Sequence, residues 1–426
     1  MASYALVDIN NFYVSAERVF NPKLNGVPTT AVSNNDGCCI SRSNEAKAPP
    51  YNIKMGEPLF KIIQRFKPGE IHIVSSNYAL YADLSDRVAH IVSMFSSSYE
   101  VYSVDEMFLD WTGLERMGLT HYGYELKDTI LKWTGLPVCV GIAATKTMAK
   151  LSNRVAKKRP EFNGVCNFKE MSTKSVDDIM ASLPVDEVWG IGHRLSTKLN
   201  QLGIRTVLDL KNAHTRTMRE KFSVVVAKTI SELRGESCID LEEQPPAKQN
   251  IASTRSFGIP ATDLSSLKES VTLYTSQAAE KARKQGSYAN SITVFIQTSP
   301  FANRPYYGNS QTVALPSPSN DTRLLVRTAL WILNRLYRPG HVYQKSGVML
   351  NDLVPAAGVQ QDMFFGQAIS TMKSEKVMAV LDAVNQRYGR QTLKLASEGF
   401  KAPWQMKQEF KTPDYTCDWD GLIKAY

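Results

Sequence analysis

Two acidic residues stand side by side between two apolar runs in the stretch YSVDEMFLDWTG, residues 102–113. A buried carboxylate without a partner costs several kcal/mol, so Asp105 and Glu106 need water or a cation. Adjacent residues on a regular strand point to opposite faces, so both acids can serve one site only at a bend. A hairpin with the pair at its tip fits the pattern. A hairpin tip without further function is the alternative, because Asp is common in turns.

A third acid, Asp8, directly follows the apolar run ALV. An acid at the end of one buried strand, next to an acid pair at a neighbouring strand junction, is an arrangement that binds divalent cations. Mg²⁺ prefers oxygen ligands. Two such ions about 4 Å apart can hold the attacking and leaving oxygens of a phosphoryl transfer. Asp8, Asp105 and Glu106 are therefore candidate metal ligands, with the hairpin-tip alternative still open.

These acids need a sheet to position them, and the surrounding sequence predicts one. Residues 4–9, 71–75, 100–104 and 136–145 have the pattern of strands, and 78–95 and 122–133 that of helices. Strands that alternate with helices predict an α/β layer. The segment 26–60 is rich in Gly, Pro and Asn and predicts a loop-rich lobe. Residues 175–235 are helical in pattern, 241–250 resemble a polar linker, and 251–350 predict a small α+β domain.

The bulk composition is that of an ordinary globular protein with roughly two to four domains in its 426 residues. Six cysteines and six histidines are scattered without a zinc-binding pattern. No apolar run approaches the roughly 20 residues of a membrane span. The first residues carry no basic region of a signal peptide. We therefore expect a cytoplasmic protein.

The net charge of +9 is concentrated in one segment. Residues 250–350 hold eleven Lys and Arg against four Asp and Glu, a net of +7, whereas residues 351–426 hold nine of each. This excess indicates a polyanionic partner, and a solvated basic face is the alternative.

Several stretches, in order along the chain, resemble the motifs of Y-family translesion DNA polymerases. They include DINNFYVSAE (8–17), YSVDEMFLD (102–110), VGIAATKTMAKLSNRVAK (140–157) and LPVDEVWGIGHRLSTKLNQLGIRTVLDL (183–210). The resemblance covers roughly residues 1–355 and is strongest for UmuC, the catalytic subunit of bacterial DNA polymerase V, and its plasmid-borne relatives.

The resemblance implies a right-hand polymerase of α/β and α+β domains. Its parts would be a palm (1–25 and 71–165), small fingers (26–70), a helical thumb with a helix–hairpin–helix (166–240), a linker (241–250), a little finger (251–355) and a tail (356–426). It implies template-directed, error-prone synthesis past damaged bases in the SOS response. A non-catalytic DNA-binding subunit with the same fold and a two-metal nuclease are the alternatives.

The resemblance also assigns roles to single residues. Asp8, Asp105 and Glu106 match the metal carboxylates, and the Ile9 carbonyl would add a ligand for two Mg²⁺ ions, which Mn²⁺ can replace. Tyr13 matches the ring that excludes a ribose 2′-hydroxyl, with Phe12 beside it. For an isolated aromatic pair after a strand, core packing is the alternative. Glu17 and Asp110 have structural roles in this interpretation.

The triphosphate contacts are predicted at Ser41, Lys47 and Lys157, with Arg42 as a possible substitute donor. Asn44 stands where many relatives have Tyr, and the stretch EAKAPPYNIKMG (45–56) carries a short insertion with two prolines. Both departures lie next to the predicted phosphate contacts in the sequence. Helical spacing places four cations on one stripe of a helix: Lys146, Lys150, Arg154 and Lys157. Contact with the triphosphate through Lys157 is one interpretation, and a solvated basic face is the alternative.

The remaining predictions concern larger partners. The turn Gly190-Ile191-Gly192 would offer backbone N–H groups to one DNA phosphate without reading bases. Gln360, Met363 and Phe364 in QQDMFF fit the spacing of peptides that bind the sliding clamp, and a structural role is the alternative. The resemblance further implies primer–template DNA, dNTPs, a processed UmuD-type homodimer and the RecA filament as partners, and a place at the bacterial nucleoid.

Overall fold

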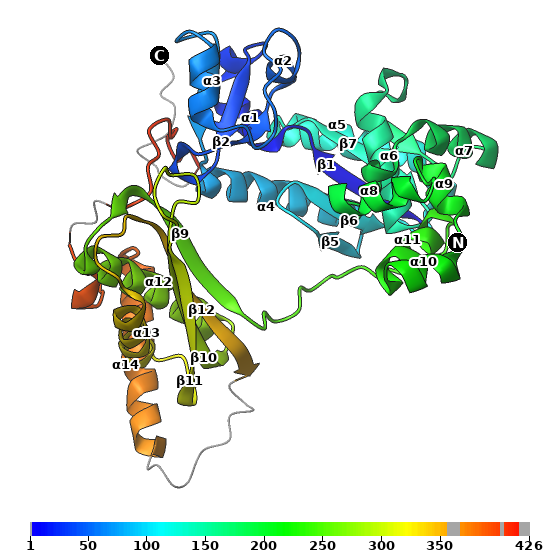
Figure 1. Ribbon diagram of the computed structural model, residues 1–426. Helices are drawn as coiled ribbons and strands as arrows, with labels where there is room; N and C mark the ends of the chain where they lie inside the picture. The colour runs from blue at the N-terminus through cyan, green and yellow to red at the C-terminus, as the bar shows by residue number, and fades with distance from the viewer. Residues whose placement is uncertain (1, 356–366, 401–403, 417–426) are drawn as a thin grey trace. The chain divides into compact units, whose positions relative to one another are not determined.

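The computed structural model describes residues 2–355, 367–400 and 404–416, with side chains in 367–372 left out. The chain divides into two compact units (Figure 1). The first comprises Met1–Ser33, Gly37–Pro245 and Phe410–Tyr426, and the second comprises Asn34–Asp36 and Pro246–Glu409. The candidate clamp-binding residues Gln360, Met363 and Phe364 lie outside the described residues.

The first unit is built on a five-stranded sheet in the order β5-β6-β1-β7-β8. Its strands are β1 (Tyr4–Ile9), β5 (Tyr99–Val101), β6 (Glu106–Asp110), β7 (Val138–Ala143) and β8 (Val165–Asn167). Strand β1 is central and pairs antiparallel with both β6 and β7. The larger helices around the sheet are α1 (Phe12–Phe20), α4 (Tyr78–Phe95), α5 (Leu119–Thr134) and α6 (Lys146–Lys158). The predicted strand at 4–9 and the predicted helix at 78–95 are confirmed at these bounds.

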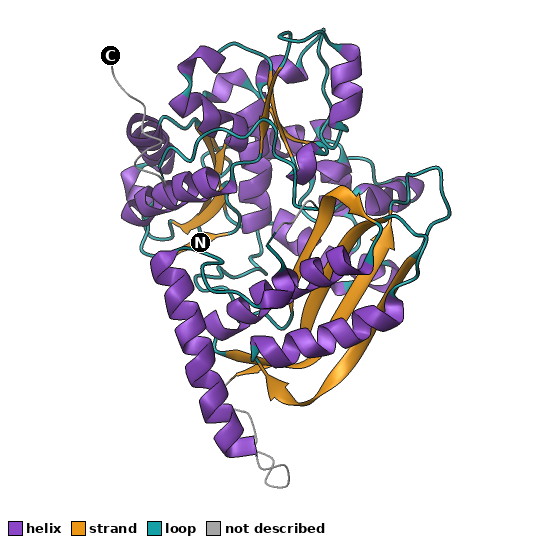
Figure 2. Cartoon of the chain, turned by 90° about the vertical axis from the view of Figure 1, so that its left-hand side faces the viewer, coloured by secondary structure: helices purple, strands orange, loops and turns teal. Residues whose placement is uncertain are grey.

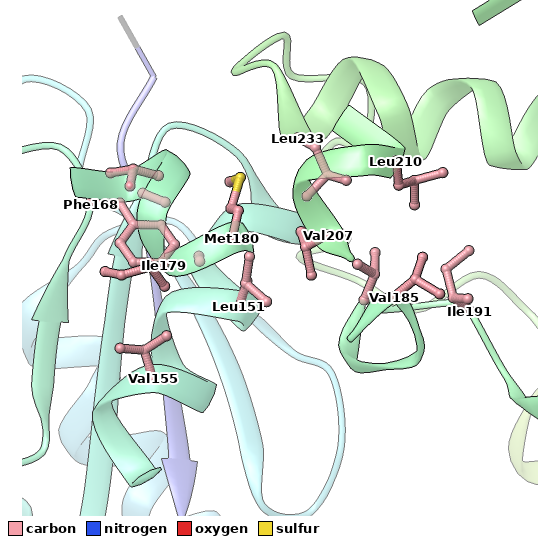
Figure 3. Close-up of a cluster of buried hydrophobic side chains, with 14 of the residues drawn as sticks. Leu151, Val155, Phe168, Ile179, Met180, Val185, Ile191, Val207, Leu210 and Leu233 are labelled. Carbon is pink, nitrogen blue, oxygen red and sulfur yellow. The ribbon is translucent and has the colours of Figure 1, made fainter. Parts of the chain in front are cut away.

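The two faces of the sheet bury different clusters. Ala5, Val7 and Ile9 pack with α1, α4 and α5 on one face, whereas Tyr4 and Leu6 pack with α6 on the other. This separation follows from the alternation of side chains along a strand. The cluster around α6 continues into the helices α7 (Thr173–Ser182), α8 (His193–Gln201), α9 (Val207–Asn212), α10 (Thr215–Lys221) and α11 (Val224–Leu233). Figure 3 shows Leu151 of α6 together with Met180 of α7 in this cluster.

The segment 26–60 contains more regular structure than its composition predicts. Strands β2 (Thr29–Val32), β3 (Cys39–Arg42) and β4 (His72–Ser75) form a separate sheet in the order β3-β2-β4. The short helices α2 (Asn44–Lys47) and α3 (Leu59–Arg65) accompany it. All four residues of β2 are buried, because β-branched Thr and Val fill both faces of a short central strand. The predicted strand at 71–75 corresponds to β4, which pairs parallel with β2.

The second unit is an α+β domain, as predicted for 251–350. Its four strands are β9 (Ile251–Ala261), β10 (Ser287–Thr298), β11 (Gly308–Ser319) and β12 (Tyr343–Pro355), in the order β11-β10-β12-β9. Helices α12 (Leu264–Lys284) and α13 (Thr322–Leu336) cover one face of this sheet (Figure 2). A further helix, α14, spans Gln367–Tyr388. No helix in the described part of the chain is long and apolar enough to cross a membrane.

Helix α6 lies unusually close to β7, and Gly141 permits that approach. A Cβ atom at Gly141 would lie 2.1 Å from the backbone nitrogen of Asn153 and 2.4 Å from the carbonyl oxygen of Ala149. The Asn153 amide also donates to the carbonyls of Leu6 and Cys139, at 3.1 and 2.8 Å. The absent side chain and the buried amide together hold α6 against β1 and β7.

We therefore expect Gly141→Ser to lower the free energy of unfolding by about 2 kcal/mol or more, because the helix must move away from the sheet. Urea denaturation measures this loss. Gly192→Ser is the matched control: its Cβ meets nothing within 4 Å, and serine is a good residue at the start of a helix. Equal stability of the two variants would show that the close approach is not required.

Candidate active site

Asp8 and Glu106 face each other across two neighbouring strands. Residues Asp8 and Glu106 are directly paired in the β1–β6 register. Asp8 lies two residues after Leu6 on β1, and Glu106 lies two residues before Phe108 on β6. Leu6 and Phe108 belong to the cluster around α6. Alternation therefore turns both carboxylates to the face that α6 covers. On this face of the sheet the apolar side chains of β1 and β6 are followed by two acids. Both acids contact lysines of α6.

Asp8 is a buried acid with a lysine partner. Its Oδ1 forms an ion pair with Nζ of Lys157, and its side chain is only 13% exposed. Burial raises the pKa of Asp8 to about 6, the Lys157 ammonium opposes this rise, and the negative charges of Glu106 and Asp105 add to it. The site thus holds more negative charge than one lysine neutralises, which is the electrostatic condition that favours binding of a further cation.

Glu106 has its own lysine. Nζ of Lys150 lies 2.7 Å from Glu106 Oε2, and it also lies over the rings of Tyr102 and Trp189 at 4.5 and 5.2 Å. The Trp189 indole donates to the Tyr102 hydroxyl at 3.2 Å. Lys150 is therefore held in place by one carboxylate and two aromatic faces.

Asp105 lies in the hairpin between β5 and β6, as predicted for the acid pair. Strand β5 pairs antiparallel with β6, and the Asp105 carbonyl accepts the backbone N–H of Ile9 at 2.8 Å. Its carboxylate accepts the Ser103 hydroxyl at 2.6 Å. The structure thus pairs Asp8 with Glu106 on neighbouring strands and places Asp105 close enough to act on the pKa of Asp8. Within the described ranges, no three Asp, Glu, His or Cys side chains converge closely enough to hold a metal ion.

The cations on the basic stripe of α6 are ion-paired, while Arg154 and Lys157 keep 42% and 28% of their side-chain surface exposed. Each of its four cations pairs with an acid from elsewhere in the chain. Lys146 is buried and lies 2.6 Å from Glu100, and Arg154 pairs with Glu187. Together with Lys150 and Lys157, they connect the helix to β1, β5, β6 and the connection between α7 and α8.

Two of the predicted triphosphate residues, Ser41 and Lys47, contact Asn11, which sequence reasoning missed. Lys47 donates to the Asn11 side-chain oxygen, and the Ser41 hydroxyl donates to the Asn11 carbonyl at 3.2 Å. The Asn11 amide donates to Asn44 at 3.1 Å. Asn11 precedes helix α1 in a left-handed conformation, with φ of 50°. Asn tolerates that region better than most residues, and this was the available signal in DINNFY.

Several cations of this region are close enough to influence one another. Burial lowers the pKa of Lys47, and the positive charges of Arg42, Lys157 and Arg154 lower it further. Arg42 donates one bond to the Ile53 carbonyl at 2.5 Å, within the predicted insertion. Its Nε is buried without a partner among the described residues. These four cations form a positive region beside Asp8, which suits a polyphosphate.

Tyr13 lies at the start of α1 on an aromatic platform. Its ring stacks on Tyr81 with centroids 4.6 Å apart and meets Tyr78 edge-on at 6.1 Å. Phe12 is buried and lies 5.5 Å from the Tyr13 ring. Tyr13 itself is only partly buried. One of the two aromatic residues is thus core, and the other presents part of its ring outside the core.

Gly190 and Gly192 lie in the turn before α8. Gly190 has φ of +85°, and Gly192 directly precedes the helix. A Cβ atom at either position would meet nothing within 4 Å, so the backbone of this turn is accessible. The location agrees with the predicted backbone contact to a phosphate, which stays a prediction.

Known proteins resemble this chain in both fold and sequence. A Y-family polymerase chimera of Dbh and Dpo4 superposes with a TM-score of 0.64 at 21% identity, covering 83% of this chain and 99% of that one. A ternary complex of Dbh DNA polymerase matches the same shares with a TM-score of 0.55. The chain therefore has the Y-family polymerase fold, as predicted.

Sequence similarity narrows this class. Models of the impB/mucB/samB family match residues 7–154, of its C-terminal domain 248–363, and of its HHH motif 173–204. The chain is 44% identical to protein UmuC of Salmonella typhimurium strain LT2, over 99% of this chain and 100% of that protein. It is 43% identical to protein ImpB of Salmonella typhimurium, over 99% of each. The chain belongs to the impB/mucB/samB family of UmuC-like Y-family polymerases.

One further match falls on a region with no assigned activity. A model described as a domain of unknown function matches residues 375–425.

A more distant relative also matches most of the chain. DNA polymerase IV of Clostridium acetobutylicum is 25% identical over 83% of this chain and 85% of that protein.

The raised pKa of Asp8 predicts a pH-dependent stability in metal-free protein. A carboxyl whose pKa rises from 3.8 in the unfolded chain to about 6 on folding binds a proton more tightly in the folded state. Stability therefore falls as the pH rises from about 4 to 6 and then levels off. Asp8→Asn removes this loss, so the variant should gain on the order of 2 kcal/mol over the wild type at pH 7.

Chemical denaturation with a chelator present, at several pH values, measures the difference. At pH 4 both proteins carry a neutral side chain at position 8, which makes that point the internal control. Parallel curves across the whole range would mean that the Asp8 carboxyl does not titrate near pH 6 in the folded protein.

Proposed function

We propose that this chain is a template-directed DNA polymerase that copies past damaged bases by two-metal-ion nucleotidyl transfer at Asp8 and Glu106. The observation that carries the proposal is the facing pair of carboxylates on β1 and β6, directly paired in register and bordered by cations. Membership of the impB/mucB/samB family supports the same activity.

The acids suit a hard divalent cation. Asp8 and Glu106 offer carboxylate oxygens, which Mg²⁺ prefers, and the burial and mutual repulsion that raise the pKa of Asp8 favour added positive charge. Asp105 and the Ile9 carbonyl are the further proposed ligands. When bound, two Mg²⁺ ions activate the attacking hydroxyl and neutralise the leaving pyrophosphate, and Mn²⁺ can replace them.

The cations beside Asp8 would bind the incoming triphosphate. In the reaction the primer 3′-oxygen forms a bond to the α-phosphorus while the bond to pyrophosphate breaks. Arg42, Arg154 and Lys157 lie close enough to Lys47 to lower its pKa, so these cations can hold a polyanion together. Lys157 pairs with Asp8 in this structure. We propose that Lys157 would pair with a phosphate oxygen once a triphosphate is bound, leaving the Asp8 carboxylate free to hold a metal ion.

Tyr13 would select the sugar of the nucleotide. One face of the Tyr13 ring stacks on Tyr81, so the ring would present a rigid surface to the sugar. A ring under the deoxyribose leaves no room for a 2′-hydroxyl. Selection by shape requires that the ring cannot move aside, which the platform of Tyr78 and Tyr81 provides.

DNA binding would be independent of sequence. The basic excess in 250–350 suits phosphate contacts by the second unit, and the turn at Gly190 and Gly192 suits one backbone phosphate. We propose that the protein acts in the SOS response at the bacterial nucleoid. A processed UmuD-type homodimer, the RecA filament and the sliding clamp would be its partners, the last through Gln360, Met363 and Phe364.

We expect Glu106→Gln to reduce primer extension by a thousandfold or more, because the amide cannot replace a metal-binding carboxylate. Extension of a labelled primer with dNTPs and Mg²⁺ measures the rate, and fluorescence anisotropy measures primer–template binding. Binding should be retained within about twofold, since the site of chemistry and the DNA contacts are separate.

The same assay separates the alternatives for the wild-type protein. Shortening of the primer would indicate a nuclease, and binding without extension would indicate a non-catalytic subunit. Full extension by a folded Glu106→Gln variant would contradict the proposed site.

We expect Tyr13→Ala to raise incorporation of ribonucleotides by about a hundredfold relative to deoxyribonucleotides, because the ring no longer occupies the 2′ position. The rough size corresponds to about 3 kcal/mol of steric selection. Single-nucleotide kinetics with dNTP and rNTP give the ratio of kcat/KM values. Tyr13→Phe keeps the ring and should keep the ratio. An unchanged ratio in Tyr13→Ala would place sugar selection elsewhere.

A further inference from the structure

A short segment near the end of the sequence, residues 410–415, lies on the first unit beside β4 and α4. The Phe410 carbonyl accepts the backbone N–H of Ser75 at 3.0 Å, and the Phe410 N–H donates to the Ser75 hydroxyl at 3.0 Å. Tyr415 stacks on Phe20 of α1 with centroids 4.8 Å apart and ring planes within 4°. Segment 410–415 is therefore attached at both of its ends.

The middle of the segment is bound by the first turn of α4. The buried Asn77 amide donates to the Thr412 carbonyl, the Thr412 hydroxyl oxygen and the Pro413 carbonyl, at 3.3, 3.2 and 3.1 Å. The same side chain caps α4 through the Leu80 N–H at 3.5 Å. Because Asn77 is fully buried and shared between the helix and the segment, the segment has a defined position on this unit.

Thr412 reaches a buried acid, Glu17. Its hydroxyl donates to Glu17 Oε1 at 3.1 Å, and the Tyr81 hydroxyl donates to the same oxygen at 2.7 Å. Glu17 is 1% exposed and has no ion pair with any described residue. A buried carboxylate needs its hydrogen-bond donors, and each one lost leaves a large desolvation cost uncompensated. Thr412 and Tyr81 thus share the Glu17 carboxylate oxygen as their common acceptor.

Tyr81 links the Glu17 carboxylate to the Tyr13 ring. Tyr81 is 1% exposed, and its ring stacks on Tyr13 with an interplanar angle of 19°. A chain of direct contacts therefore runs from Thr412 through Glu17 and Tyr81 to Tyr13. The contact between Thr412 and Glu17 joins residues 395 positions apart in the sequence.

We infer that Thr412 and Glu17 are positioning residues that hold Tyr13 in place for sugar discrimination, and that this is a function of the 375–425 region. The inference rests on the proposed function of Tyr13. Thr412 of segment 410–415 donates a hydrogen bond to Glu17, and Glu17 accepts another from the Tyr81 hydroxyl. The Tyr81 ring in turn stacks on Tyr13. Loss of the Thr412 hydroxyl loosens the support without removing any group that touches the nucleotide.

The test is the ratio of kcat/KM for dNTP over rNTP in full-length Thr412→Val. Valine keeps the shape and removes the donor. We expect the ratio to fall about tenfold, the effect of one hydrogen bond to a charged group, mainly through faster use of rNTP. Thr412→Ser restores the hydroxyl and should restore the ratio. Lys411→Gln, whose side chain pairs only with Asp414 in the described structure, is the control in the same segment and should leave the ratio unchanged.

A double-mutant cycle with Glu17→Met, which removes the acceptor oxygens at similar size, tests whether Thr412 acts through Glu17. The two substitutions should be non-additive, because the second removes an interaction already lost. Melting temperatures of all variants show that each is folded. An unchanged ratio in Thr412→Val, an equal loss in Thr412→Ser, or full additivity would each overturn the inference. Failure of Tyr13→Ala to change the ratio would instead overturn the role of Tyr13 itself.

Discussion

The close contact of α6 with β1 and β7 is the constraint on which the rest of the site depends. Gly141 has no side chain at the crossing, and Asn153 bonds to the carbonyls of two strands. The helix therefore lies near enough for its cations to reach Asp8 and Glu106. Without that proximity the two facing acids would be buried without partners, at a cost of several kcal/mol.

This contact gives the site two interchangeable sets of charges. In the structure, Lys157 and Lys150 neutralise Asp8 and Glu106. In the proposed reaction, Asp8 and Glu106 would hold the metal ions, and the triphosphate would offer new partners to the lysines. An acid that is paired before substrate binds does not need to be desolvated alone, which keeps the fold stable while the site is free of nucleotide. Burial raises the pKa of Asp8 even with the Lys157 ammonium beside it.

Local sequence patterns predicted the parts of the site that depend on neighbours along the chain. The apolar run ALV predicted that Asp8 lies at the end of a buried strand, and the acid pair in YSVDEMF predicted the hairpin. The resemblance to Y-family polymerases supplied the roles of Tyr13 and Lys157, which no periodicity could have provided. The fold and the family are confirmed, and the residue roles are proposals.

Contacts between distant segments could not be predicted in this way. The partner of Arg154 is Glu187, and that of Glu17 is Thr412, and neither pair has a spacing that reveals it. The basic stripe of α6 reads as a solvent-exposed face from its periodicity alone, because the acids that pair with it come from other elements. The strand β2 was hidden by the polar composition of its surroundings.

Binding of Mn²⁺ followed by electron paramagnetic resonance tests the central claim most directly. Wild-type protein with primer–template and a non-hydrolysable dNTP should bind two ions in the micromolar range, whereas Asp8→Asn, a nearly isosteric change, should bind about one or none. Since binding is measured without turnover, a defect in catalysis alone cannot produce this result. Equal numbers of bound ions in the two proteins would contradict the account, because Asp8 would then not be part of a metal site.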